Sequence, residues 1–77
     1  MINISSYSLI LGGEKALNDI SPTPRLDSEL LLAKVLNLDR VQFYSKDIFP
    51  KRKQIQVYES LLKQRMDGIP IAYLTGN

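Results

Sequence analysis

Apolar residues recur at intervals of three and four positions between Leu26 and Leu38, and so form a wide stripe along one helical face. Thr23 stands before a proline, which makes it a good N-cap with Pro24 at the first helical position. Asn37 can end such a helix in a left-handed conformation. This stretch therefore predicts one long amphipathic helix over residues 24–37.

Two further helices are predicted downstream. Residues 51–67 place one apolar face opposite a charged one, and Gly68 is a plausible residue to end that helix. Residues 40–46 predict a short helix, because Asp39 and Gln42 have the spacing of a capping box.

The stretch 3–19 has a weaker helical pattern, carried by Ile4, Tyr7 and Leu11 together with Ile10 and Leu17. Gly12-Gly13 lies in its middle and costs about 1 kcal/mol per glycine relative to alanine. Either the helix breaks at this pair, or the glycines let another element approach closely. We favour one imperfect helix.

The order of these elements predicts an all-α fold, a small bundle of four or five helices. No strand-length alternation and no repeat is visible, and short loops favour antiparallel neighbours. We expect residues 1–67 to form the bundle. After Gly68, Pro70 either begins one more helical turn through Tyr73 or Leu74 or enters an extended segment, and the propensities leave both open.

The residue types exclude most enzymatic chemistry. The 77 residues contain no histidine and no cysteine, which removes the usual general base and the commonest metal ligands. Asp27 and Glu29 are two positions apart on a helix and point to different faces, so we interpret them as ordinary charges near its N-terminal end. We predict no catalytic, cofactor-binding or metal-binding residue in this chain.

Lys51, Arg52 and Lys53 form the one cluster of charge. Cations at a helix start oppose the helix dipole, which either reflects an anionic partner or is the small cost of a solvated face. Three cations are too few to indicate nucleic acid. No apolar run is long enough to cross a membrane, and the N-terminus lacks the basic region of a secretory signal. We therefore expect a cytoplasmic protein.

Four tyrosines fall in different predicted elements and form no stacking platform. We expect Tyr7, Tyr44 and Tyr58 in the core with their hydroxyls reaching water, and Tyr73 in an uncovered apolar segment near Asn77.

Two stretches resemble one protein family. RLDSELLLAKVLNLDR, residues 25–40, and LLKQRMDGIPIAYLTGN, residues 61–77, are similar to the second-helix and hinge signatures of the release factor glutamine methyltransferase family (HemK/PrmC). The second stretch is the more specific one. Its matching residues are Arg65, Gly68, Pro70, Ala72, Tyr73, Leu74, Thr75 and Gly76.

The resemblance implies a small helical N-terminal domain, a connecting segment that begins in residues 68–77, and a C-terminal Rossmann-like domain. That last domain binds S-adenosylmethionine and carries an Asn-Pro-Pro-Tyr motif, which this sequence lacks. Family members methylate the glutamine of the Gly-Gly-Gln motif in class I peptide release factors. We expect this chain to be the front part of such an enzyme, with a release factor and its own catalytic domain as partners.

Under the same resemblance, Lys51, Arg52 and Lys53 are candidates for steering an acidic region of the release factor. The alternative is a stand-alone helical adaptor that binds a protein partner or nucleic acid. The continuation of the reading frame discriminates between the two, since a Gly-rich loop and Asn-Pro-Pro-Tyr would follow only in the methyltransferase.

Overall fold

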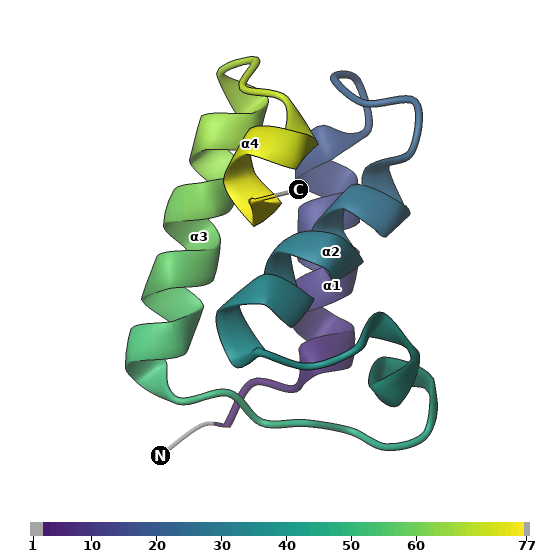
Figure 1. Ribbon diagram of the computed structural model, residues 1–77. Coiled ribbons are helices and arrows are strands. Elements are labelled where there is room, and N and C mark those ends of the chain that lie inside the picture. The colour runs from purple at the N-terminus through teal and green to yellow at the C-terminus, as the bar shows by residue number, and fades with distance from the viewer. Residues whose placement is uncertain (1–2, 77) are drawn as a thin grey trace.

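The computed structural model describes residues 3–76, so Met1, Ile2 and Asn77, at the ends of the predicted bundle and connector, lie outside it. Within this range the chain forms four α-helices and one 3-10 helix, and no strand (Figure 1). The fold class predicted from the sequence is confirmed. The elements in order are α1 (Ser6–Leu17), α2 (Pro24–Leu36), η1 (Arg40–Tyr44), α3 (Arg52–Met66) and α4 (Ile71–Thr75).

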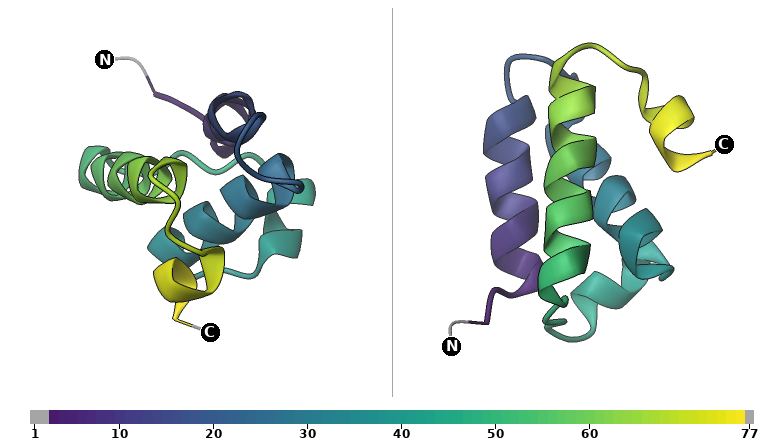
Figure 2. Two further views of the ribbon diagram at one scale, coloured as in Figure 1. Left: turned by 90° about the horizontal axis from the view of Figure 1, so that it is seen from above. Right: turned by 90° about the vertical axis from the view of Figure 1, so that its left-hand side faces the viewer.

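Helices α1, α2 and α3 pack against one another, and α4 packs on α2 and α3. Two perpendicular views place α1 and α4 on opposite sides of the α2–α3 pair (Figure 2). Ile10, Leu31, Leu32 and Tyr58 form the buried centre, so each of the three long helices contributes to it. A shared core of this kind holds the three helices against one another.

The long helix α2 begins and ends as its sequence predicts. Pro24 is its first residue, and Asn37 follows it with φ +55° and ψ +48°, the left-handed conformation. Thr23 occupies the N-cap position, but its hydroxyl donates to the Asp27 carboxylate at 3.1 Å and caps no backbone N–H. The helix start is therefore set by the proline and by Asp27.

Helix α3 ends at the glycine that the sequence indicates. Gly68 has φ +99°, and its N–H donates to the carbonyl of Arg65 at 3.1 Å, while the N–H of Ile69 donates to Gln64 at 3.2 Å. These two bonds are the pair that defines a Schellman motif. The chain then turns through Pro70 into α4, so of the two predictions for this segment the helical one is confirmed.

The segment predicted as a short helix over residues 40–46 is a 3-10 helix, and it ends two residues earlier, at Tyr44. Its capping glutamine behaves as predicted, since Gln42 Oε1 accepts the N–H of Asp39 at 3.1 Å.

Helix α1 runs unbroken through Gly12-Gly13, which confirms one helix, shorter at both ends than the predicted 3–19. A methyl group added to Gly13 would overlap the hydroxyls of Ser28 and Tyr58, whereas one on Gly12 would meet open space. Gly13 thus permits the close approach of α2 and α3, which is the second of the two interpretations offered for this pair.

The predicted burial of the tyrosines is wrong for two of them. Tyr7 and Tyr44 are exposed, and only Tyr58 is in the core. The buried residues of α1 are Ser6, Ile10, Gly13 and Leu17. A face made partly of serine and glycine does not register as hydrophobic, so the sequence pattern favoured the neighbouring face with Tyr7 and Leu11.

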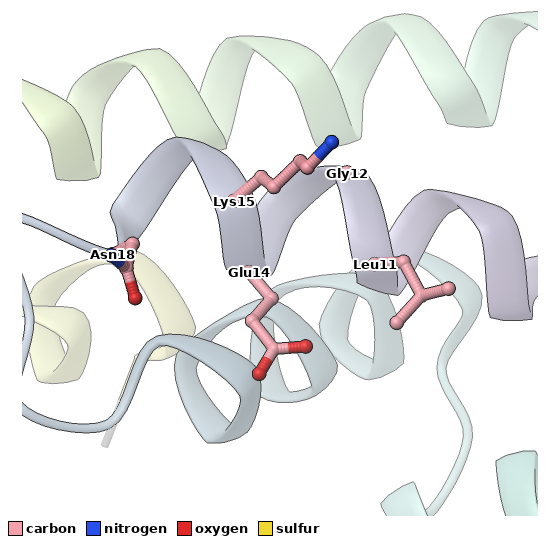
Figure 3. A pocket seen from close by; sticks show the side chains of 5 residues that line it. All are labelled: Leu11, Gly12, Glu14, Lys15 and Asn18. Atoms are coloured by element: carbon pink, nitrogen blue, oxygen red, sulfur yellow. The ribbon is translucent and has the colours of Figure 1, made fainter.

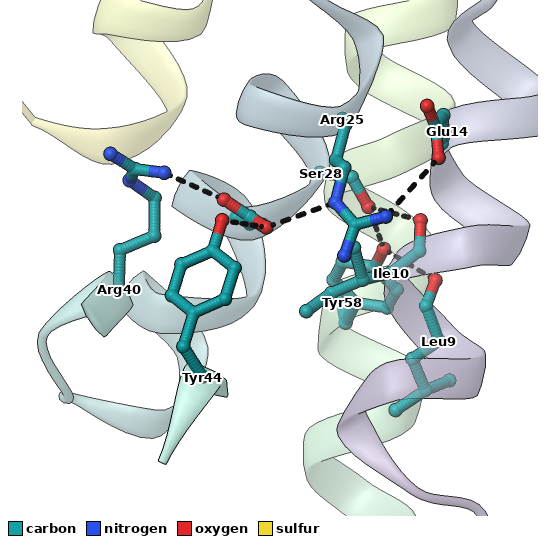
Figure 4. Close-up of polar contacts among 9 residues, drawn as sticks. Leu9, Ile10, Glu14, Arg25, Ser28, Arg40, Tyr44 and Tyr58 are labelled. Carbon is teal, nitrogen blue, oxygen red and sulfur yellow. Dashed lines mark hydrogen bonds and ion pairs between the residues drawn. The ribbon is translucent and has the colours of Figure 1, made fainter. Parts of the chain in front are cut away.

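Tyr58 also differs from the prediction in where its hydroxyl points. The hydroxyl donates to the carbonyl of Leu9 at 2.9 Å and lies 2.6 Å from Ser28 Oγ, which donates to the carbonyl of Ile10 at 3.1 Å (Figure 4). Burial raises the pKa of Tyr58 to about 12, although the hydrogen bond with Ser28 opposes this rise. The hydroxyl therefore joins α3 to α1 and α2 and does not reach water.

Candidate partner-binding surface

The three cations singled out in the sequence lie together at the start of α3. Lys51 is the N-cap and Arg52 and Lys53 are the first two helical residues. All three are exposed, and none takes part in the ion pairs found within residues 3–76. The N–H of Lys51 donates to Gln54 Oε1 at 2.8 Å, which fixes where the helix begins. The cluster therefore presents unneutralised positive charge to solvent.

A groove of about 880 Å³, here called the α3 groove, lies beside this cluster. Its walls come from the segment before α1, the loop before α3 and the first two turns of α3. Ile4 and Phe49 are 41 % and 56 % exposed there. Apolar and charged side chains both line the groove, and its lining residues are Asn3, Ile4, Phe49, Pro50, Lys51, Arg52, Ile55, Gln56 and Glu59.

The loop that carries Phe49 is tied to the start of α1 by two hydrogen bonds. The N–H of Ser6 donates to the carbonyl of Ile48 at 2.6 Å, and the N–H of Ile48 donates to Ser6 Oγ at 3.2 Å. Ser6 is itself buried. The walls of the α3 groove are thus held by contacts between segments more than forty residues apart.

A second hollow of about 680 Å³ lies over α1 and is lined by Leu11, Gly12, Glu14, Lys15 and Asn18 (Figure 3). Its charges are of both signs. Glu14 also faces Arg25 of α2 at 3.9 Å. The residues here include no pair suited to general acid–base or nucleophilic chemistry.

The interpretation of Asp27 and Glu29 as ordinary charges at a helix end is wrong. Both are buried, with 3 % and 1 % of their surface exposed. They do point to different faces, and each lies in a separate polar network. Each also has a partner from an element distant in the sequence, Arg65 for Asp27 and Arg40 and Tyr44 for Glu29, which the local pattern does not reveal.

Glu29 accepts three hydrogen bonds, from Tyr44 at 2.6 Å, from Arg40 at 2.7 Å and from Arg25 at 3.3 Å (Figure 4). Burial alone would raise the pKa of Glu29, but these hydrogen bonds outweigh it and hold the pKa below its ordinary value. The carboxylate therefore stays ionised and fastens η1 to α2.

Asp27 accepts from Ser21 at 2.7 Å, from Thr23 at 3.1 Å and from Arg65 at 3.1 Å. Three fixed donors occupy most of the acceptor positions of this carboxylate, and burial keeps the remainder away from a substrate. Both acidic residues therefore hold helices together, and neither has the open geometry of a general acid or base.

Apart from Arg65 in α3, the residues that match the hinge signature lie in α4 and on either side of it. Leu74 packs against the core together with Ile71, while Tyr73 is 82 % exposed. Gly68 and Gly76, at the two ends of this segment, both have positive φ, +99° and +80°. The glycines at these positions thus allow turns that other residues would adopt only with strain.

Within the described part of the chain, no group of three or more acidic, histidine or cysteine side chains could hold a metal ion. Over the same residues, the helices are all too short or too polar to span a bilayer.

Comparison with known proteins gives the family. Residues 8–76 match the family described as the PrmC N-terminal domain. A protein named release factor glutamine methyltransferase from Chlorobaculum tepidum is 37% identical over 77 residues, covering 99% of this chain and 25% of that protein. Proteins of the same name from Coxiella burnetii and Rhodopirellula baltica are 39% and 37% identical over 61 and 57 residues.

These two matches cover 78% and 73% of this chain but 22% and 19% of the relatives. The chain therefore spans about a fifth to a quarter of the length of the curated relatives it matches. The family match covers both stretches that carry the resemblance and nearly all of the described fold. The chain belongs to the PrmC N-terminal domain family.

Proposed function

We propose that this domain is the substrate-binding front part of a cytoplasmic protein-glutamine methyltransferase. The enzyme would transfer a methyl group from S-adenosylmethionine to the glutamine of the Gly-Gly-Gln motif in class I peptide release factors. The observation that carries the proposal is the family match over residues 8–76, together with relatives named release factor glutamine methyltransferase. The cofactor and the reacting groups would belong to a following catalytic domain.

A second binding surface suits an enzyme whose substrate is a folded protein. One glutamine in a loop offers little contact area, whereas a stable protein interface buries about 800 Å² per partner. Binding energy gained away from the reacting atoms can position the glutamine against the methyl group. The helical domain would supply this remote contact.

Lys51, Arg52 and Lys53 are the residues we assign to that contact. They are exposed, lie together and take no part in the ion pairs of residues 3–76. Unneutralised charge on a fixed helix start raises the association rate with an oppositely charged partner. We expect them to face an acidic region of the release factor.

Residues 68–77 would begin the connector to the catalytic domain. Gly68 has a positive φ and Pro70 a φ of −59°, so the direction of the chain after α3 is restricted at two positions. The exposed Tyr73 is then available to the segment or domain that follows.

The test is a pull-down of a release factor by the full-length methyltransferase with and without residues 1–67. We expect deletion to abolish or strongly weaken binding, while binding of S-adenosylmethionine shows that the catalytic domain remains folded. Intact release factor binding after the deletion would mean that recognition lies elsewhere.

A further inference from the structure

We infer that the α3 groove is the docking site for an extended segment of the substrate protein that carries a carboxylate and one apolar side chain. This inference rests on the proposed function, since it takes the release factor as the partner. It goes further by naming the site and the chemistry of the segment that fills it.

The apolar lining of the α3 groove calls for an apolar side chain. Phe49 and Ile4 are large apolar residues about half exposed, and Ile55 of α3 lies between the same walls. Removing apolar surface from water is favourable in proportion to the area removed. An aliphatic or aromatic side chain of a partner would cover these apolar residues in the way that anchor residues fill pockets in protein interfaces.

The α3 groove is also formed in advance. The two hydrogen bonds between Ser6 and Ile48, at 2.6 and 3.2 Å, hold the loop that carries Phe49 against the start of α1. A site that is already ordered loses little conformational entropy when a partner binds. The loop that carries Phe49 is therefore a fixed feature that a partner segment can recognise.

Charge sets the direction of the bound segment. Lys51 and Arg52 lie at one end of the α3 groove, and Glu59 lies seven residues further along the same helix. Seven helical residues span roughly 10 Å. An extended chain covers that distance in about three residues. The complementary segment therefore has a carboxylate near Arg52, an apolar side chain in the middle, and a basic side chain or free N–H group near Glu59.

The same features favour a peptide over nucleic acid. Glu59 would repel a phosphate backbone that follows the α3 groove past Arg52. Nucleic-acid grooves carry many cations and several stacking aromatics, whereas this one has two cations and the single aromatic ring of Phe49.

The test compares two substrates of the full-length methyltransferase: an intact release factor, and a short synthetic peptide holding only the Gly-Gly-Gln loop. We expect Phe49→Ala and Arg52→Glu each to raise KM for the intact release factor about tenfold, as loss of an interface anchor does. The methylation rate of the short peptide should stay unchanged, because the peptide cannot reach the α3 groove.

Matched controls lie outside the α3 groove. Tyr7→Ala removes an aromatic ring of similar exposure, 55 %, from α1, and Lys63→Glu reverses a charge near the other end of α3. Both should leave KM for the release factor unchanged. Circular dichroism and thermal unfolding show that all four variants are folded.

Two results would overturn the inference. In the first, Phe49→Ala and Arg52→Glu behave like the controls; if deletion of residues 1–67 still abolishes binding, the proposed function stands and only the docking site is wrong. In the second, both variants weaken binding of a fluorescein-labelled single-stranded RNA while KM for the release factor is unchanged, which would make the α3 groove a nucleic-acid contact.

Discussion

The Arg65 guanidinium donates to the buried carboxylate of Asp27 at 3.1 Å and so joins the last turn of α3 to the first turn of α2. Asp27 is almost fully buried, and only 14% of the Arg65 side chain is exposed. Because Arg65 stands three residues before Gly68, this contact also fixes the position from which the chain leaves α3.

Replacing Arg65 by alanine should destabilise the domain by roughly 2–4 kcal/mol, because it leaves the Asp27 carboxylate buried without its countercharge. Lys63→Ala, which removes an exposed cation two residues away, should change the free energy of unfolding by less than about 0.5 kcal/mol. Urea unfolding followed by circular dichroism measures both. Equal losses of unfolding free energy in the two variants would show that the Arg65–Asp27 pair contributes nothing to stability.

The two adjacent glycines of α1 should respond to alanine in opposite directions. Gly13→Ala forces a methyl group against Ser28 and Tyr58 and should cost about 1–3 kcal/mol. Gly12→Ala meets open space and should stabilise the helix by up to about 1 kcal/mol. Thermal unfolding of the two variants gives the comparison, and a stabilised Gly13→Ala would contradict the packing described for α1.

Glu29 should make stability depend on pH in the acid range. Its pKa is lowered in the folded state, because hydrogen bonds from Tyr44, Arg40 and Arg25 outweigh the opposing effect of burial. The stability that Glu29 contributes is therefore fully present above the pKa of an unfolded glutamate, about 4.3. It is lost as pH falls through the lower pKa of Glu29 in the folded state.

The measurement is urea unfolding of the original chain and of Glu29→Gln between pH 6 and pH 3. The difference in midpoint should shrink as pH falls. Glu59→Gln removes one negative charge from an exposed position of α3 and serves as the control. A difference between the original chain and Glu29→Gln that stays constant over this range would refute the assignment.

Tyr58 should make stability depend on pH in the alkaline range. Burial raises its pKa to about 12, so the stability it contributes is present below its unfolded value of about 10 and is lost as pH rises toward 12. Tyrosine ionisation followed at 295 nm should lose its highest step in Tyr58→Phe. If Tyr58→Phe instead removes a step near pH 10, the Tyr58 hydroxyl is exposed to water and the burial described here is contradicted.

Local signals in the sequence predicted both ends of α2 and the end of α3. Pro24, Asn37 and Gly68 act through their own backbone geometry, and the structure places each where the prediction did. The burial of Glu29 was missed for the opposite reason. Its donors Arg40 and Tyr44 lie eleven and fifteen residues away, and only the docking of η1 on α2 brings them together.

The inward face of α1 shows a second limit of periodicity. Ser6 and Gly13 are buried because α2, α3 and the loop before α3 approach α1 closely there. Gly13 is small enough to permit the approach, and the Ser6 hydroxyl accepts a hydrogen bond from the loop. Hydrophobicity ranked Tyr7 and Leu11 above them. The α3 groove was not predicted either, because the basic cluster 51–53 contains no apolar residue that would indicate it. The groove forms where residues 3 and 4 and the loop 47–50 meet the start of α3.

The most direct measurement is the association rate of the full-length methyltransferase with a release factor at low salt, determined by stopped flow. Reversing Lys51, Arg52 and Lys53 together to glutamate should slow association about tenfold or more, and the difference should narrow as salt screens the charges. Reversal of the exposed Lys15, Lys46 and Lys63 gives the same change in net charge at scattered positions and should have a much smaller effect. An unchanged rate in the Lys51, Arg52, Lys53 variant would contradict the account.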